Sequence, residues 1–163
     1  MNTPPVPRVL VVDDVLQVRQ VFGRFLTMAG MEPSFAADGV DGLAEARVSP
    51  PDLVLCDLEM PRMDGVALCA ALRADAATRR VPIVAVTGSG GDAALSAIAA
   101  GCDAVLQCDG RMDHMNEVAA AVGDLAPEAE ARLARAMAMR FTPDDEMDFA
   151  AALAKRDALL ALV

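Results

Sequence analysis

The first 124 residues alternate five times between a short segment typical of a buried strand and a segment with helical spacing. Val9–Val12 and Leu53–Cys56 are apolar runs of the kind that parallel sheets bury on both faces. Apolar residues then recur at intervals of three and four from Val18 to Ala29, and Gly30 supplies a helix stop. The expected strands cover 9–12, 32–36, 53–56, 81–86 and 104–106, and the helices that follow them cover 18–29, 39–48, 64–75, 92–100 and 113–122. This alternation predicts the doubly wound α/β class, a five-stranded parallel sheet with helices on both faces and right-handed connections.

The strand pattern stops after Asp124, and residues 125–163 are predicted to be helical. Pro127–Arg140 has helical spacing, and Thr142 can cap a second helix whose first turn is acidic. We therefore expect a domain over 1–124 followed by a C-terminal helical hairpin over 125–163. The apolar side chains expected to face one another in this hairpin are Leu133, Met137, Phe149 and Leu153.

Several uses of this C-terminal extension are open. Apolar residues near its end favour a homodimer or the docking of a partner. The extension could equally be a linker to a further output domain, or it could fold back on its own domain and leave the protein monomeric. It is acidic and too short for a helix-turn-helix domain with a basic recognition helix, which argues against DNA binding.

The composition limits the core and the partners. Aromatic residues make up only 3% of the chain, so the core is predicted to be aliphatic and filled by methionine. A net charge of −10 lacks the basic footprint of a nucleic-acid binder, and it does not suit an anionic membrane surface. The residues before the first strand contain no apolar run of the kind expected in a signal peptide, and the four cysteines lack zinc-site spacing. These features predict a cytoplasmic protein with reduced thiols, in which Cys56, Cys69 and Cys102 are simply small buried hydrophobic residues.

Three carboxylates follow two of the expected strands. Asp13 and Asp14 come directly after the first strand, and Asp57 comes directly after the third. If these strands are neighbours, as in a sheet of order 2-1-3-4-5, the three side chains meet beyond the carboxyl ends of the strands, where such sheets form their sites. Converging like charges require a cation or a proton, and oxygen ligands favour Mg²⁺. The alternative is that Asp13 and Asp14 merely begin a helix.

The same residues carry a resemblance to a known family. Val9-Leu-Val-Val-Asp-Asp14 resembles the start of a response-regulator receiver domain, and Asp57-Leu-Glu-Met-Pro-Arg-Met-Asp-Gly65 resembles its phosphoacceptor loop. Val84-Ala-Val-Thr-Gly88 is similar to the fourth strand with its switch threonine, and Gly101-Cys-Asp-Ala-Val-Leu106 is similar to the fifth strand. The resemblance covers about residues 8–124. It implies the flavodoxin-like strand order 2-1-3-4-5.

The resemblance also implies a role for each site residue. Asp57 would accept a phosphoryl group from a partner histidine kinase or phosphotransfer protein, forming an acyl phosphate. Asp14 would bind Mg²⁺ directly, Asp13 would bind it through water, and Asp57 and the backbone carbonyl of Glu59 would complete the metal site. Thr87 would donate a hydrogen bond to the phosphoryl group. Positioning and neutralisation of charge would then do most of the catalytic work.

Two positions depart from the family pattern. Cys108 stands where receivers carry a lysine, and Val105 stands where they carry an aromatic switch residue. The nearest cations in the sequence are Arg62 and Arg111, and either could reach a phosphate or be a solvated surface residue. Cys108 could be redox-active, but its acidic surroundings predict a raised thiol pKa and favour a simple loss of the lysine's function. His114 is more typical of a surface or packing residue than of a phosphotransfer histidine.

Three functions remain at this stage. The carboxylates and Thr87 favour a phosphorylatable signalling module, which is not an enzyme in its own right. Cys108 and Val105 favour a pseudo-receiver, a binding or scaffold module of the same fold with weak or no phosphorylation. A Mg²⁺-dependent phosphohydrolase fits least well, because Met60-Pro61 follows Asp57 closely and no substrate-gripping cap segment is evident.

Overall fold

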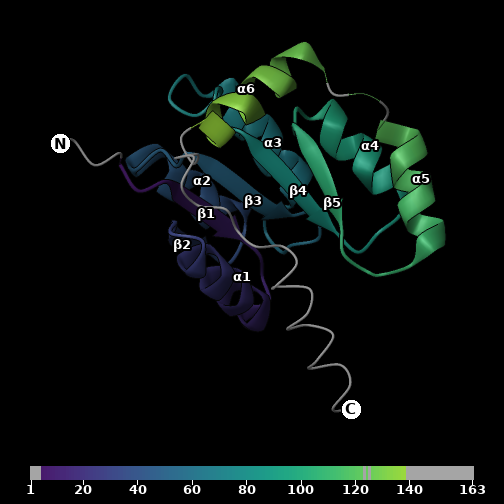
Figure 1. The fold of residues 1–163 in the computed structure, drawn as a ribbon, viewed down its shortest axis with the longest axis horizontal. Helices are drawn as coiled ribbons and strands as arrows, with labels where there is room; N and C mark the ends of the chain where they lie inside the picture. The colour runs from purple at the N-terminus through teal and green to yellow at the C-terminus, as the bar shows by residue number, and fades with distance from the viewer. Residues whose placement is uncertain (1–4, 123, 125, 139–163) are drawn as a thin grey trace.

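The computed structural model describes residues 5–122, 124 and 126–138. Five parallel strands form one sheet in the order β2-β1-β3-β4-β5, as Figure 1 shows. The strands are β1 (Arg8–Val12), β2 (Glu32–Ala36), β3 (Leu53–Asp57), β4 (Ile83–Thr87) and β5 (Ala104–Gln107). This arrangement confirms the predicted doubly wound class and the strand order that the resemblance implied.

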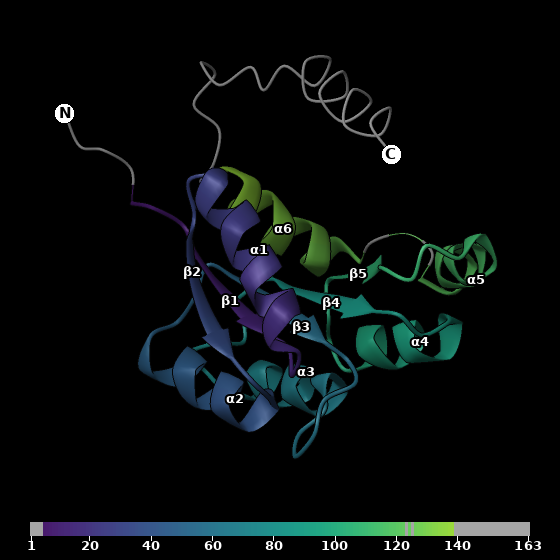
Figure 2. The ribbon, with the colours of Figure 1, turned by 90° about the horizontal axis from the view of Figure 1, so that it is seen from below.

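Six helices accompany the sheet in the described part of the chain. They are α1 (Leu16–Met28), α2 (Gly39–Val48), α3 (Gly65–Ala74), α4 (Gly91–Ala99), α5 (Met112–Val122) and α6 (Pro127–Ala138). Figure 2 shows α1 and α6 on one side of the sheet, α2 and α3 on the other, and α4 beside α5 at the β5 edge. None of the described helices is long and apolar enough to span a membrane.

The strands and helices predicted over residues 9–122 all exist, and their boundaries differ by at most two residues from those predicted. The largest difference among the strands is β4, which begins at Ile83 rather than Val81 and includes Thr87. Pro82 has no N–H to donate to a neighbouring strand, although its carbonyl still accepts from the Val54 N–H at 2.9 Å. The shift matters because it makes Thr87 the last residue of a strand, fixed by the sheet rather than by a loop.

The core is aliphatic, as predicted, and among the described methionines only Met60 is buried in it, with Met63 packed against it. The central strands bury the side chains of Val9, Leu10, Val11, Val12, Val54, Cys56, Ile83 and Ala85. Met60 is buried, whereas Met28, Met112 and Met115 are exposed, so the expectation that methionines fill the core is wrong for these three.

Helix α1 also exposes more apolar surface than its spacing suggested. Its inward stripe runs through Val18, Phe22 and Leu26, which are half-buried, while Val21 and Phe25 are exposed. Gly23 explains the close packing, because a Cβ there would lie 2.6 Å from Cζ of Phe35 on β2. The glycine therefore allows α1 to approach β2 closely at this point.

The first helix of the C-terminal extension packs on the domain. Ala129 is buried, and Arg132, Leu133 and Ala136 are half-buried, so one face of α6 is covered. This agrees with the alternative in which the extension folds back on its own domain, as far as α6 is concerned. The second helix of the predicted hairpin, with Phe149 and Leu153, lies outside the described residues, as does the predicted contact with it.

Two cysteines form a disulfide, which corrects the prediction of reduced, separate thiols. Cys69 on α3 is bonded to Cys102, which precedes β5, with 6.1 Å between their Cα atoms. Cys56 and Cys108 are free cysteines, the first buried as predicted and the second exposed. The pairing could not be predicted from spacing because 33 residues separate the two cysteines and only the packing of α3 against the α4–β5 turn brings them together.

Candidate functional site

The predicted carboxylates converge at the carboxyl ends of β1 and β3. Asp13, Asp14 and Asp57 each offer a carboxylate oxygen, and these three atoms all lie within 4.8 Å of one another. Asp13 is only 6% exposed, Asp57 is half-buried and Asp14 is exposed. The cluster therefore has a buried floor and one side open to solvent, so a small ligand could approach from outside.

Backbone hydrogen bonds fix two of these side chains. The Val15 N–H donates to Oδ1 of Asp13 at 2.8 Å, and the Glu59 N–H donates to Oδ1 of Asp57 at 3.3 Å. Gly65 is needed nearby because a Cβ at that position would lie 2.2 Å from the backbone oxygen of Asp57. The first turn of α3 thus packs directly against the end of β3. This close packing explains why the loop in the family-like motif ends in glycine.

The cluster carries more negative charge than its surroundings balance. Burial raises the pKa of Asp57, and the nearby charges of Asp13 and Asp14 add to that rise. Burial also raises the pKa of Asp13, with a further contribution from Asp14. Within the described ranges, no arginine, lysine or histidine forms an ion pair with these three carboxylates. Such an arrangement suits a hard divalent cation with oxygen ligands.

Thr87 and Cys108 lie at the ends of the two strands that complete the site. Thr87 is 1% exposed, and its Oγ1 accepts from the Ser89 N–H at 2.9 Å. The Cys108 N–H donates to the backbone oxygen of Thr87 at 2.9 Å. Burial raises the pKa of the Cys108 thiol, and the charges of Asp109 and Asp57 raise it further. A thiol held in its neutral form is a poor nucleophile, which agrees with the predicted loss of function rather than a redox role for Cys108.

Neither arginine considered as a substitute for the lysine forms an ion pair with the acidic cluster in the described residues. Arg62 forms ion pairs with Asp38 and with Asp41, the latter at 2.8 Å. Arg111 pairs with Asp113 at 2.5 Å. Both arginines are therefore surface residues with acidic partners close to them in space. Both side chains are more than half exposed, as expected for solvated surface arginines, and their ion pairs were not predicted from the sequence.

The structure also reveals polar contacts that the sequence did not predict. The Ser89 hydroxyl donates to the Glu59 carboxylate, which links the loop after β4 to the loop after β3. The Arg19 guanidinium donates to the backbone oxygen of Asp13. His114 on α5 pairs through Nδ1 with Asp109, which supports a packing role for this histidine. No short motif marks these pairs, because each joins residues from different loops or helices.

Comparison with known proteins identifies the family. The sequence profile of the response regulator receiver domain matches residues 9–120. The DNA-binding dual master transcriptional regulator RpaA of Synechocystis is 37% identical over 84 residues, which are 52% of this chain but only 35% of that protein. The chain thus corresponds to about a third of this curated relative.

Solved structures agree with this assignment. The chemotaxis protein CheY4 of Vibrio cholerae is 28% identical, with a TM-score of 0.62 over 73% of this chain and 100% of that chain. The receiver domain of the Pseudomonas aeruginosa sensor histidine kinase PA1611, solved with a magnesium ion coordinated in its active-site cleft, is 25% identical. Its TM-score is 0.60 over 74% of this chain and 100% of that chain. Together with the acidic cluster at the carboxyl ends of β1 and β3, these matches show that the chain belongs to the family of response-regulator receiver domains.

Proposed function

We propose that this receiver accepts a phosphoryl group on Asp57 from a histidine kinase or a phosphotransfer protein and relays the signal through protein–protein contacts. The single observation that carries the proposal is the convergence of three carboxylate oxygens within 4.8 Å at the end of the sheet. Asp57 is the member of the cluster that ends β3 and is half-buried, so its carboxylate is held in place yet accessible. A carboxylate so placed can attack phosphorus and form an acyl phosphate.

The residues present also fit Mg²⁺. The side chains of Asp13, Asp14 and Asp57, and the backbone carbonyl of Glu59, are the proposed ligand set, and hard oxygen donors are those that Mg²⁺ prefers. Bound there, the cation would neutralise the carboxylates and the incoming phosphoryl oxygens. The chain's own contribution is to hold Asp57 through the Glu59 N–H and to present Thr87 from the end of β4 as a hydroxyl donor to the phosphoryl group.

A second candidate is a pseudo-receiver that binds partners with weak or no phosphorylation. Cys108 follows β5, and the charge of Asp57 contributes to raising the pKa of its thiol. Unlike a lysine, Cys108 cannot supply a positive charge. Val105, also on β5, is half-buried and has no ring to swing inward. These two positions favour slow phosphorylation or altered switching, while the intact carboxylate cluster favours phosphorylation itself.

One assay separates these candidates. The full chain is incubated with Mg²⁺ and acetyl phosphate, and the adduct is located by mass spectrometry of the intact protein and its peptides. We expect one phosphoryl group on Asp57, no adduct in Asp57→Asn, and a strongly reduced rate in Asp14→Asn or with a chelator. Absence of any adduct in the wild type would favour the pseudo-receiver, and sustained release of phosphate without an adduct would favour a phosphohydrolase.

The same assay tests the missing lysine. Cys108→Lys places a cation at the edge of the site and should raise the rate of adduct formation about tenfold or more, as expected for one charge-stabilising group. Cys108→Met is the matched control, because it changes size without adding charge. If Cys108→Lys leaves the rate unchanged while Arg111→Ala abolishes the adduct, Arg111 has taken over the role despite its pairing with Asp113.

The remaining parts of the proposal concern the setting of the protein. We propose a cytoplasmic location, where a histidine kinase presents its phosphoryl group, and output through a partner protein or a second copy rather than through nucleic acid or membrane. The acidic charge of −10 supports the exclusion of nucleic acid. Light scattering on the full chain and on a version that ends at Asp124 would show whether the C-terminal extension mediates self-association.

A further inference from the structure

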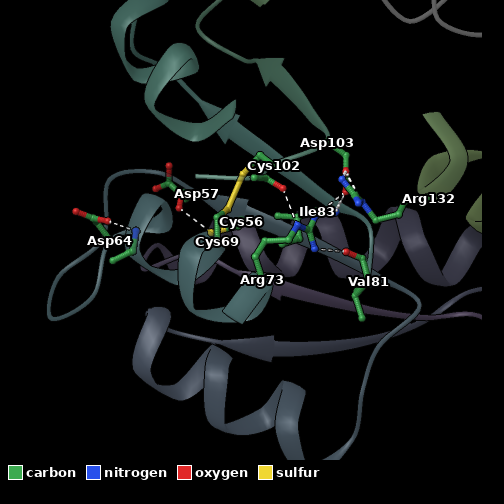
Figure 3. The surroundings of a disulfide bond; sticks show 12 residues. Cys56, Asp57, Asp64, Cys69, Arg73, Val81, Ile83, Cys102, Asp103 and Arg132 are labelled. Carbon is green, nitrogen blue, oxygen red and sulfur yellow. Dashed lines mark hydrogen bonds and ion pairs between the residues drawn. A yellow bond between two sulfur atoms is a disulfide. The ribbon is translucent and has the colours of Figure 1, made fainter. Parts of the chain in front are cut away.

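A disulfide and an ion-pair network both connect helix α3 to residues 101–103, just before β5. Cys69 lies in the middle of α3, and Cys102 lies in the turn between α4 and β5 (Figure 3). The two cysteines are 0% and 5% exposed, and their Cα atoms are 6.1 Å apart, within the range that a disulfide spans. The packing of α3 against the turn between α4 and β5 thus brings the two cysteines to bonding distance.

Arg73, one turn after Cys69, holds the residues that flank Cys102. Its Nε donates to the backbone oxygen of Gly101 at 2.8 Å, and its Nη2 donates to Oδ2 of Asp103 at 2.8 Å. Its Nη1 donates to the backbone oxygen of Val81 at 2.7 Å. Helix α3 is therefore attached to residues 101–103 twice, covalently through Cys69 and ionically through Arg73.

Asp103 also forms an ion pair with α6, so it connects that helix to α3. The Asp103 carboxylate is 1% exposed and accepts from the Ile83 N–H at 2.8 Å as well as from Arg73. Its other oxygen, Oδ1, accepts from Nε of Arg132 on α6 at 2.7 Å. Because Asp103 directly follows Cys102, the position of the cysteine sets the position of the carboxylate to which α6 is anchored.

We propose that Cys69 and Cys102 are a reversible oxidation site whose disulfide fastens α3 to the start of β5 and thereby holds α6 in its docked position. The reaction partner is a small-molecule disulfide such as oxidised glutathione. One cysteine thiolate attacks it and releases one glutathione thiolate, and the second cysteine then attacks the mixed disulfide and releases the other. The protein loses two electrons and two protons, and one glutathione disulfide is reduced to two thiols.

The other two cysteines, Cys56 and Cys108, are not disulfide-bonded. Cys56 lies beside the disulfide in Figure 3, but its Sγ donates to the backbone oxygen of Asp57 at 3.0 Å. Cys108 is exposed at the far end of β5. The proposed function includes a cytoplasmic location. Disulfides in cytoplasmic proteins are usually transient and respond to redox conditions. The bonding geometry of Cys69 and Cys102 does not depend on that setting.

The experiment compares the full chain after equilibration with oxidised or reduced glutathione. Denatured, alkylated protein should show two free thiols in the oxidised sample and four in the reduced one, with the bond mapped to the peptides of Cys69 and Cys102. The Cys108→Ser variant is used for mapping because it removes the thiol that shares a tryptic peptide with Cys102. A bond that involves Cys56, or no bond at all, would overturn the proposal.

Two further measurements test the effect on α6. Closing a loop of this length should raise the melting temperature by about 10 °C in the oxidised sample. Amide hydrogen exchange within 127–136 should be roughly threefold or more faster in the reduced sample, because docking of α6 is then less secure. Equal exchange of α6 in both samples would contradict the proposed link between the disulfide and the helix.

Variants distinguish the effect of the disulfide on α6 from its effect on the stability of the whole domain. Cys69→Ala and Cys102→Ala should each abolish the difference between oxidised and reduced samples, whereas Cys56→Ala should retain it. Arg132→Gln should keep the shift in melting temperature but make exchange of α6 insensitive to redox state. The comparison is made within each variant, so a cavity left by alanine affects both samples equally. If Cys102→Ala does not fold, Cys69→Ser serves in its place. None of these readouts requires phosphorylation, so they can fail or succeed independently of the proposed function.

Discussion

At the carboxyl ends of the strands, Asp13, Asp14 and Asp57 lie together, and none of them has an ion-pair partner in the described part of the chain. At the amino end of β5, Asp103 is more deeply buried, yet it lies between Arg73 and Arg132. The carboxylates at the two ends of the sheet thus differ in whether cations of the chain pair with them. A buried carboxylate with its own cations is costly to remove because its partners are left unpaired, whereas carboxylates without cations are available to an external one.

The largest expected effect is at Asp103. Replacing it with alanine leaves two half-buried arginines without their partner and should cost about 3–5 kcal/mol of the free energy of unfolding. Urea denaturation measures this cost. The matched control is Asp14→Ala without Mg²⁺, which should change stability by no more than about 0.5 kcal/mol, since it removes an exposed charge from a repulsive cluster. Similar losses for both variants would contradict the distinction between the two ends.

Mg²⁺ should stabilise the acidic end without affecting the other. At a concentration of about 100 times its Kd, the cation should add about 2.7 kcal/mol to the free energy of unfolding, because it binds the folded state. The gain is measured by denaturation with Mg²⁺ and with a chelator. It should disappear in Asp57→Asn and persist in Arg132→Gln. A gain of the same size in Asp57→Asn would mean that the ion binds elsewhere.

Loss of Arg132 should be milder than loss of Asp103. Arg132→Ala removes a charged hydrogen bond to Asp103 but leaves the carboxylate paired with Arg73, so we expect a cost of about 1–2 kcal/mol. Amide exchange should show the loss mainly in α6. Arg135→Ala, on the exposed side of the same helix, is the control and should have little effect. Equal changes in the two variants would show that Asp103 does not anchor α6.

The smallest effect is expected at Asp38, which lies at the acidic end but has its own cation. Burial opposes ionisation of Asp38, but hydrogen bonds from the Asp41 N–H and from Arg62 outweigh it and lower the pKa. A carboxylate with a lowered pKa stabilises the folded state above its unfolded pKa, and the contribution is lost as the pH falls through the folded value.

Wild type and Asp38→Asn should therefore differ slightly in stability at pH 7 and converge as the solution is made more acidic than about pH 4, the ordinary pKa of aspartate. Denaturation across this pH range provides the test. A difference that grows on acidification would indicate that Arg62 does not stabilise the charged form. Convergence would show that the hydrogen-bond donors and the cation around Asp38, rather than its location in the sheet, decide how this carboxylate behaves.

Much of the fold and of the acidic site could be predicted from the sequence because the signals are local. A strand followed directly by Asp13 or Asp57 places that carboxylate at a strand end whatever surrounds it, and parallel strands bring their ends to one edge. The helical spacing of α2 to α5 likewise depends on neighbouring residues only. The family motifs then indicated which strands are neighbours.

Only the tertiary structure decided which distant side chains meet. Cys69 and Cys102 are 33 residues apart, Arg73 and Asp103 are 30 apart, and Arg132 and Asp103 are 29 apart. No periodicity or motif relates residues at such separations, so the sequence predicted a reduced pair of cysteines and left open whether the extension folds back. Packing of α3 and α6 against the start of β5 resolved both questions for the described residues. The physical reason is that local spacing fixes the direction of a side chain along its own helix or strand, whereas its partner depends on how these elements pack in three dimensions.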